Sequence, residues 1–344
     1  MKAIQFSIFL LIVGCTSNQP LEPGIERLET PTESLLQAIS QVDKETAWIS
    51  GHNASFIRTK DGGQSWKLFQ HPTADSLQFR DIHGFDENKA ILMSAGPGSL
   101  SRIFTFQNDS IWEENFVMED SLGFLDCIDF WDDQNGIAYG DAIDTYPYIL
   151  LTSDGGKSWD RAPTENIPEA GQGEGGFAAS GTCVTTGDNG SAWIATGAGG
   201  NCRILLTQDF GKTWQSVDSP LIKGEAAGNT SVSFIGNTGF LTGGDLLKSD
   251  EYTNNCAFSR DGGQSWTLAG QPKTNGAFYG GSITSSGNQF FAFACGPNGL
   301  DYTSDLGVTW TTLDTLNYWA TSFYENIGYA SGRGGEVLKI TLQE

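Results

Sequence analysis

Three carboxylates, Glu174, Asp141 and Asp245, could supply the acid and the base of a hydrolytic reaction. Glycosidases use such a pair, held roughly 5–9.5 Å apart on either side of the bond that breaks. Acidic residues are abundant here, however, because Asp and Glu number 41 against 19 Lys and Arg, which gives a net charge of −22. Carboxylates are therefore weak evidence of catalysis, and no complete catalytic set accompanies them. We expect a protein without enzymatic activity. If it does catalyse a reaction, we expect a glycoside hydrolase.

A wider set of side chains could bind a ligand without reacting with it. Tyr279, Tyr318 and Trp319 are aromatic, and flat aromatic faces are surfaces on which sugars stack. Arg80 and Asp126 hold matching places early in two apolar segments, so we expect them to face the same space. The candidate binding residues are Arg80, Asp126, Glu174, Tyr279, Tyr318, Trp319 and Arg333.

Metal, cofactor and nucleic-acid chemistry have little support in the sequence. The three histidines form no HExxH motif and the cysteines form no CxxC pair, so we expect no metal site. The segment 171–176 fits GxGxxG, but no strand precedes it and no helix follows, so we expect no dinucleotide cofactor. A net charge of −22 argues against nucleic acid, which is bound through clustered cations.

The first residues are typical of a bacterial lipoprotein signal. Lys2 precedes a short apolar run that ends in Ile12-Val13-Gly14-Cys15, and the run is too short to span a bilayer. We expect cleavage of residues 1–14, a lipid on Cys15 and a flexible tether over residues 15–24. The protein would then lie at the bacterial cell envelope and touch the membrane only through this anchor. An ordinary signal peptide with an incidental cysteine remains the alternative. The other five cysteines do not reveal a pairing.

One eight-residue pattern, S/T-x-D-x-G-x-S/T-W, occurs five times, and we call these segments the repeat turns. The Asp carboxylate can accept backbone N–H groups of its own turn, and Gly can adopt a positive φ there. We therefore expect structural roles for Asp61, Asp154, Asp209, Asp261 and Asp305. The repeat turns are Thr59–Trp66, Thr152–Trp159, Thr207–Trp214, Ser259–Trp266 and Thr303–Trp310.

Short apolar strands that end in Gly fill the gaps between the repeat turns. Seven of them occur, and their closing glycines lie 36 to 57 residues apart, about the length of one four-stranded propeller blade. The second unit has a degenerate turn over 105–112, and the seventh lacks an outer strand. The segment Ile25–Glu29 is a spare strand that could complete the seventh blade. We predict an all-β, seven-bladed β-propeller over residues 25–344.

The repeat turns resemble the Asp box, also called the BNR repeat. Together with Phe79-Arg80-Asp81-Ile82 and Gly173–Ser180, they resemble the photosystem II stability/assembly factor family over residues 25–344. That resemblance implies a propeller scaffold that binds partner proteins during assembly of a membrane complex, without a known reaction. The strong negative charge departs from that family, so the partner is left open.

Carbohydrate-active proteins also carry Asp boxes and form the alternative class, either as hydrolases or as glycan-binding modules. The Phe-Arg-Ile-Pro opening of sialidases is absent, and one propeller is too short for the two-propeller xyloglucan enzymes. Ligand sites of propellers prefer the face opposite the repeat turns, where two long loops are expected, over 161–176 and 244–255. We expect a monomer whose partner is an envelope protein or a glycan.

Overall fold

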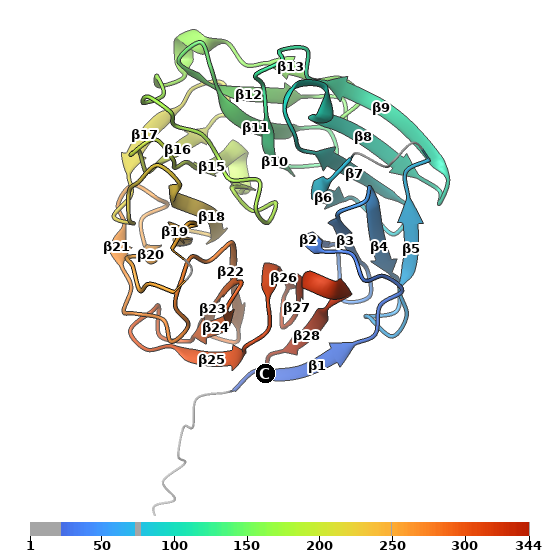
Figure 1. Cartoon of the computed structure of the whole chain (residues 1–344), viewed down its shortest axis with the longest axis vertical. Helices are drawn as coiled ribbons and strands as arrows, with labels where there is room; N and C mark the ends of the chain where they lie inside the picture. The colour runs from blue at the N-terminus through green and yellow to red at the C-terminus, as the bar shows by residue number, and fades with distance from the viewer. Residues whose placement is uncertain (1–21, 73–76, 249, 344) are drawn as a thin grey trace, which may run out of the picture.

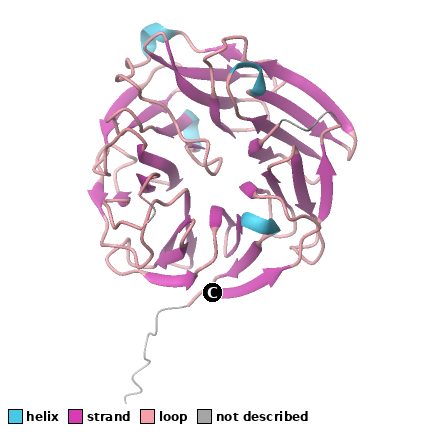
Figure 2. Ribbon diagram, in the orientation of Figure 1, coloured by secondary structure: helices cyan, strands magenta, loops and turns pink. Residues whose placement is uncertain are grey.

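The computed structural model describes residues 22–72, 77–248 and 250–343, so Cys15 and the expected signal segment lie outside the described residues. Seven four-stranded antiparallel sheets are arranged as blades around a central axis (Figure 1). The predicted seven-bladed β-propeller is thus confirmed. Strands predominate, and four short 3-10 helices account for the helical turns drawn in Figure 2. None of the helices in the described part is long and apolar enough to cross a membrane.

Each blade runs outward from an inner strand that borders the channel. Blades one to three contain the following strands: β2 (Leu36–Gln41), β3 (Ala47–Gly51), β4 (Ser55–Thr59) and β5 (Lys67–Gln70); β6 (Phe79–Gly84), β7 (Lys89–Ser94), β8 (Arg102–Gln107) and β9 (Ile111–Val117); β10 (Leu125–Phe130), β11 (Gly136–Ile143), β12 (Tyr146–Thr152) and β13 (Asp160–Arg161).

The later blades repeat this order, and the last blade takes its outer strand from the other end of the chain. Blades four to seven contain β14 (Val184–Thr186), β15 (Ser191–Ala195), β16 (Arg203–Gln208) and β17 (Gln215–Asp218); β18 (Ala227–Ile235), β19 (Thr238–Asp245), β20 (Cys256–Ser259) and β21 (Thr267–Leu268); β22 (Gly280–Ser286), β23 (Gln289–Gly296), β24 (Gly299–Thr303) and β25 (Thr311–Asp314); β26 (Tyr318–Tyr324), β27 (Ile327–Gly332), β28 (Val337–Thr341) and β1 (Gly24–Leu28). The 3-10 helices are η1 (Gly98–Leu100), η2 (Thr164–Asn166), η3 (Asp188–Gly190) and η4 (Arg333–Gly335).

The ring is closed by β1, which pairs antiparallel with β28 as the sequence predicts. The register runs from Gly24 opposite Thr341 to Leu28 opposite Val337. In addition, the Arg27 guanidinium donates to a carboxylate oxygen of Asp314 in blade six at 2.5 Å. This closure joins the two ends of the chain and covers the edge that the last blade would otherwise expose.

Aromatic side chains fill the space between neighbouring blades. Trp48 and Phe56 of blade one are fully buried against Phe106 of blade two, with ring centroids 6.2 Å and 4.9 Å from that of Phe106. Edge-to-face contacts of this kind stabilise the interface beyond the burial of apolar area. The inner strands are therefore held at set positions around the channel, and their side chains can form a fixed site.

The repeat turns hold themselves in shape by hydrogen bonds within eight residues. In the turn of blade five, Asp261 accepts the backbone N–H of Ser265 at 2.9 Å and its hydroxyl at 2.5 Å. The Ser265 hydroxyl, with the backbone and hydroxyl bonds of the same turn, lowers the pKa of Asp261 to about 2. Gly263 has φ of +87° and donates its N–H to the Ser259 hydroxyl at 2.9 Å. The same arrangement recurs in the other four repeat turns.

The degenerate turn of blade two forms contacts with the neighbouring blade. Its Asp109 accepts from the Arg58 guanidinium and from the Lys67 ammonium, both of blade one and both at 2.7 Å. The hydrogen bond from Arg58, which is 4% exposed, is the main reason that the pKa of Asp109 falls to about 2. This turn therefore links two blades instead of stabilising only itself.

The propeller has two different faces. The repeat-turn face carries the repeat turns and the hairpins between first and second strands. The insertion face carries the loops between second and third strands and the connections from blade to blade. Both long loops lie on the insertion face. They run over 162–183, between β13 and β14, and over 246–255, between β19 and β20.

Candidate functional site

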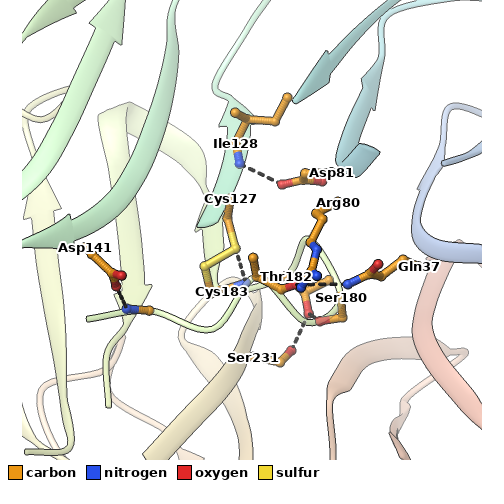
Figure 3. The surroundings of a disulfide bond; sticks show 12 residues. Gln37, Arg80, Asp81, Cys127, Ile128, Asp141, Ser180, Thr182, Cys183 and Ser231 are labelled. Atoms are coloured by element: carbon orange, nitrogen blue, oxygen red, sulfur yellow. Dashed lines mark hydrogen bonds between the residues drawn. A yellow bond between two sulfur atoms is a disulfide. The ribbon is translucent and has the colours of Figure 1, made fainter. Parts of the chain in front are cut away.

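The long connection over residues 162–183 turns into the central channel, and we call it the plug (Figures 1 and 3). The carbonyl oxygen of Ala178 accepts the Gln37 side-chain amide at 2.9 Å and the Arg80 guanidinium at 3.0 Å. Gln37 belongs to blade one and Arg80 to blade two, although the plug leaves from blade three. The plug therefore crosses the channel at the insertion face.

The far end of the plug is bound to blade five. The backbone N–H of Val232 donates to the carbonyl of Thr182 at 2.9 Å, and the Thr182 hydroxyl donates to that of Ser231 at 2.7 Å. Its near end pairs with the loop after β15, where Gly175 and Gly197 exchange two backbone hydrogen bonds of 3.0 Å. Because it binds four blades and leaves a fifth, the plug braces the ring from inside.

A disulfide joins the end of the plug to the channel wall. Cys127 of β10 is bonded to Cys183, 56 residues further along the chain (Figure 3). Cys202, Cys256 and Cys295 are free and buried. The odd number of cysteines did not point to this pair. The signal available in the sequence is positional, because Cys127 lies early in an inner strand and Cys183 directly before the next one.

Glu174 is the buried anchor at the base of the plug. Its side chain is 2% exposed and accepts the Arg203 guanidinium at 2.7 Å and the Thr196 hydroxyl at 2.6 Å. The second carboxylate oxygen accepts the backbone N–H of Gly171 at 2.7 Å. With these three partners, this carboxylate is engaged in holding the plug to blade four.

Asp126 and Asp141 lie under the plug on blade three. Asp141 accepts the backbone N–H of Gly176 at 3.0 Å, and burial raises its pKa (Figure 3). Asp126 is 1% exposed and packs so closely on Gly176 that a Cβ there would lie 2.5 Å from its Oδ2. Burial, followed by the charge of Asp141, raises the pKa of Asp126 well above its ordinary value, and the Arg80 charge opposes this. The structure thus brings three of the candidate residues, Glu174, Asp126 and Asp141, together around the plug. We call these three residues the seat of the plug.

The remaining candidates lie around the insertion face. The rings of Tyr279 and Trp319 meet edge to face, with centroids 4.7 Å apart, and both side chains are half-buried. Asp245 accepts the backbone N–H of Leu247 at 3.1 Å and so shapes the loop over 246–255. Tyr318 differs from these, because it is fully buried in blade seven and offers no ring face to a ligand. Arg333, in η4, is exposed.

Apolar side chains are also exposed on this face; Tyr252 is one that the sequence places there, whereas Leu247 was not expected. Leu247 is 79% exposed and Tyr252 is 58% exposed, both in the loop of blade five. We call these two residues, with Tyr279 and Trp319, the apolar rim. The described part of the chain holds no group of three or more His, Cys, Asp or Glu side chains that could bind a metal ion.

Together, the fold and the plug define the class as a seven-bladed β-propeller whose channel is crossed by a plug at the insertion face. No model of a known protein family matches the sequence, and a search of curated proteins finds no match. Solved structures share the architecture. YCF48 from Cyanidioschyzon merolae superposes with a TM-score of 0.65 at 15% identity, over 92% of this chain and 98% of that one.

Two further structures are similar over nearly their whole length. YCF48 bound to D1 peptide gives a TM-score of 0.62 at 15% identity, over 93% of this chain and 97% of that one. Virginiamycin B lyase from Staphylococcus aureus gives 0.66 at 14% identity, over 94% of this chain and 100% of that one. At such low identity, these similarities establish the fold alone.

Proposed function

We propose that this protein is an envelope-anchored scaffold that binds a partner protein through the insertion face and has no catalytic activity. The observation that carries the proposal is the plug. It engages Glu174, Asp141 and Asp126 in contacts within the chain, and it occupies the channel at the face where ligand sites of propellers are expected. What the insertion face offers to a second molecule is a surface with exposed apolar side chains. Such a surface suits protein docking better than turnover of a small substrate.

The similar structures support this use of the fold. One of them is YCF48 with a D1 peptide bound, so a propeller of this architecture can hold a segment of another protein. The net charge of −22 favours a partner whose contact surface is basic around an apolar centre. The rim would supply the apolar centre of the interface.

The envelope location is supported by two features. The sequence of residues 12–15 resembles the end of a lipoprotein signal. The disulfide between Cys127 and Cys183 belongs to an oxidising compartment, because cytosolic thiols are kept reduced. Labelling with a radioactive fatty acid tests the anchor. Label that persists in Cys15→Ala would contradict it.

A glycan is the second candidate ligand, and the pair of Tyr279 and Trp319 favours it. Their rings lie half-buried on the insertion face, where a sugar could stack on the exposed parts. In this case the protein would be a glycan-binding module, since the carboxylates under the plug are buried. Binding to a glycan array that disappears in Trp319→Ala would favour this candidate.

A photo-crosslinking experiment in intact envelopes tests the protein partner. A crosslinkable residue is placed at position 247 on the insertion face or, as a control, at position 308 on the repeat-turn face. Leu247 and Val308 are matched apolar side chains, 79% and 74% exposed. We expect one protein adduct at position 247, none at position 308, and loss of the adduct when Trp319→Ala is added. Equal adducts at both positions, or none at either, would contradict the proposal.

A further inference from the structure

A cavity lies in the channel, on the opposite side of the plug from the insertion face. It has a volume of about 560 Å³ and opens on the repeat-turn face. Gly181 and Thr182 of the plug are part of its lining, and the inner strands of the blades form its wall. The plug thus borders this space on the side of the insertion face. We call this space the chamber; its volume lies within the range of small-molecule sites.

The carboxylates that line the chamber already have partners within the chain. The Asp129 carboxylate accepts the backbone N–H groups of Phe130 and Thr186, and His83 Nδ1 lies 3.1 Å from it. The Thr186 hydroxyl lies within hydrogen-bond distance of both this carboxylate and the Phe130 carbonyl. Asp81 accepts two backbone N–H groups, those of Ile82 and Ile128, at 2.7 and 2.6 Å.

The carboxylate at the mouth of the chamber also has a partner within the chain, because Glu325 forms an ion pair of 2.7 Å with Lys44. An anionic ligand would find no unpaired cation among the described residues of the lining. A cationic ligand would find no carboxylate without a partner there. The electrostatics of the chamber therefore favour a neutral ligand.

Uncharged hydrogen-bonding groups, in contrast, remain without partners. The hydroxyls of Thr185, Ser285 and Ser322 line the chamber and form no hydrogen bond within the described part of the chain. The side-chain oxygen of Gln41 is buried and likewise unpaired. A buried polar atom without a partner costs free energy, so the Gln41 oxygen favours a ligand that donates a hydrogen bond. The three hydroxyls are partly exposed to the chamber, where each can both donate to and accept from a ligand.

We propose that the chamber binds a small, neutral polyhydroxylated molecule of the size of a monosaccharide. Each hydroxyl of such a ligand can donate and accept, which matches the unpaired hydroxyls and the amide oxygen of the wall. The ligand would enter from the repeat-turn face, and the plug would form the floor under it. This site is separate from the apolar rim and does not depend on the proposed partner protein.

Isothermal titration of the mature protein tests the proposal with named probes. The neutral probes are glucose, galactose and myo-inositol, and the charged analogues are glucosamine and gluconate. We expect at least one neutral probe to bind, with each charged analogue at least about tenfold weaker because its charge would be buried without a partner. Thr185→Val and Ser322→Ala should each weaken binding by about three- to tenfold, the effect of one lost hydrogen bond. Ser110→Ala, in the exposed turn of blade two, is the matched control and should bind like the wild type.

Several results would overturn the proposal. These are the absence of heat with every neutral probe at its solubility limit, tighter binding of glucosamine or gluconate, and unchanged affinity in Thr185→Val. Melting curves of each variant show whether the propeller is intact. If Thr185→Val unfolds, the test rests on the affinity of Ser322→Ala, on the opposite wall, for the neutral probe. Trp319→Ala on the insertion face should leave sugar affinity unchanged, which separates this site from the glycan candidate at the rim.

Discussion

The disulfide between Cys127 and Cys183 should supply a large share of the stability of the protein. It closes a loop across 56 residues of sequence separation, and the loop-closure entropy removed from the unfolded chain corresponds to about 4 kcal/mol. We therefore predict that the double variant Cys127→Ala/Cys183→Ala lowers the free energy of unfolding by about 4 kcal/mol relative to a control without the crosslink effect.

Urea titration followed by tryptophan fluorescence measures this free energy. The matched control is Cys256→Ala/Cys295→Ala, which also removes two buried sulfur atoms but breaks no covalent bond. Burial raises the pKa of the Cys256 and Cys295 thiols, so in the wild type and in Cys127→Ala/Cys183→Ala they stay protonated and unreactive during the measurement. A difference below about 1 kcal/mol between the two double variants would refute the loop-closure argument, because that is the size of an ordinary substitution effect.

The same variant also tests the bracing role of the plug. Cys183 ends the plug, so its release should increase amide hydrogen exchange over residues 171–182 before other segments respond. The control variant should leave that exchange unchanged. Faster exchange spread equally over all blades would show that the disulfide stabilises the fold without holding the plug.

Three further predictions concern closure, acid stability and the seat of the plug. Arg27→Ala leaves the buried carboxylate of blade six without its cation, and we expect a loss of about 1 to 3 kcal/mol in urea titrations; an unchanged midpoint would contradict the closure role. Asp261 has a pKa of about 2 because the Ser hydroxyl of its own turn binds the ionised form, against 3.8 in the unfolded chain. Its contribution to stability is complete above pH 4 and is lost as the pH falls from about 4 to about 2; Asp261→Asn should flatten this part of the curve of melting temperature against pH. Gly176→Ala places a Cβ 2.5 Å from Asp126 Oδ2, so it should displace the plug and lower the melting temperature, whereas Gly24→Ala, whose Cβ meets only Thr341 at 3.7 Å, should be neutral.

Most of the fold could be predicted from the sequence because its signals are local. A repeat turn forms its hydrogen bonds within eight residues, so the pattern around Asp261 indicates the turn wherever it occurs. The closing strand β1 could be predicted by counting, since seven units offered one strand too few at the end and one too many at the start. Blade two could be predicted from spacing and from Trp112, which its degenerate turn retains, although this turn binds Arg58 of the neighbouring blade.

The candidate site was less predictable, because its residues meet only across the channel. Arg80, Asp126, Asp141 and Glu174 were all chosen from the sequence, but their common partner was not. The segment over 161–176 was expected as a surface loop, whereas the connection runs to residue 183 and enters the channel. Nothing in the local pattern of Ala178 indicates that its carbonyl lies beside blades one and two.

The sequence by itself determined the blades, their number and the closing strand, because hydrogen bonds within a turn and strand alternation depend on neighbours along the chain. Only the tertiary structure decided the pairing of Cys127 with Cys183, the burial of Glu174 and the chamber under the plug. Those features depend on contacts between residues that are 29 to 141 positions apart, and such contacts exist only once the ring has closed. The physical reason is that closure brings seven inner strands around one axis, where a single inserted segment can touch several of them.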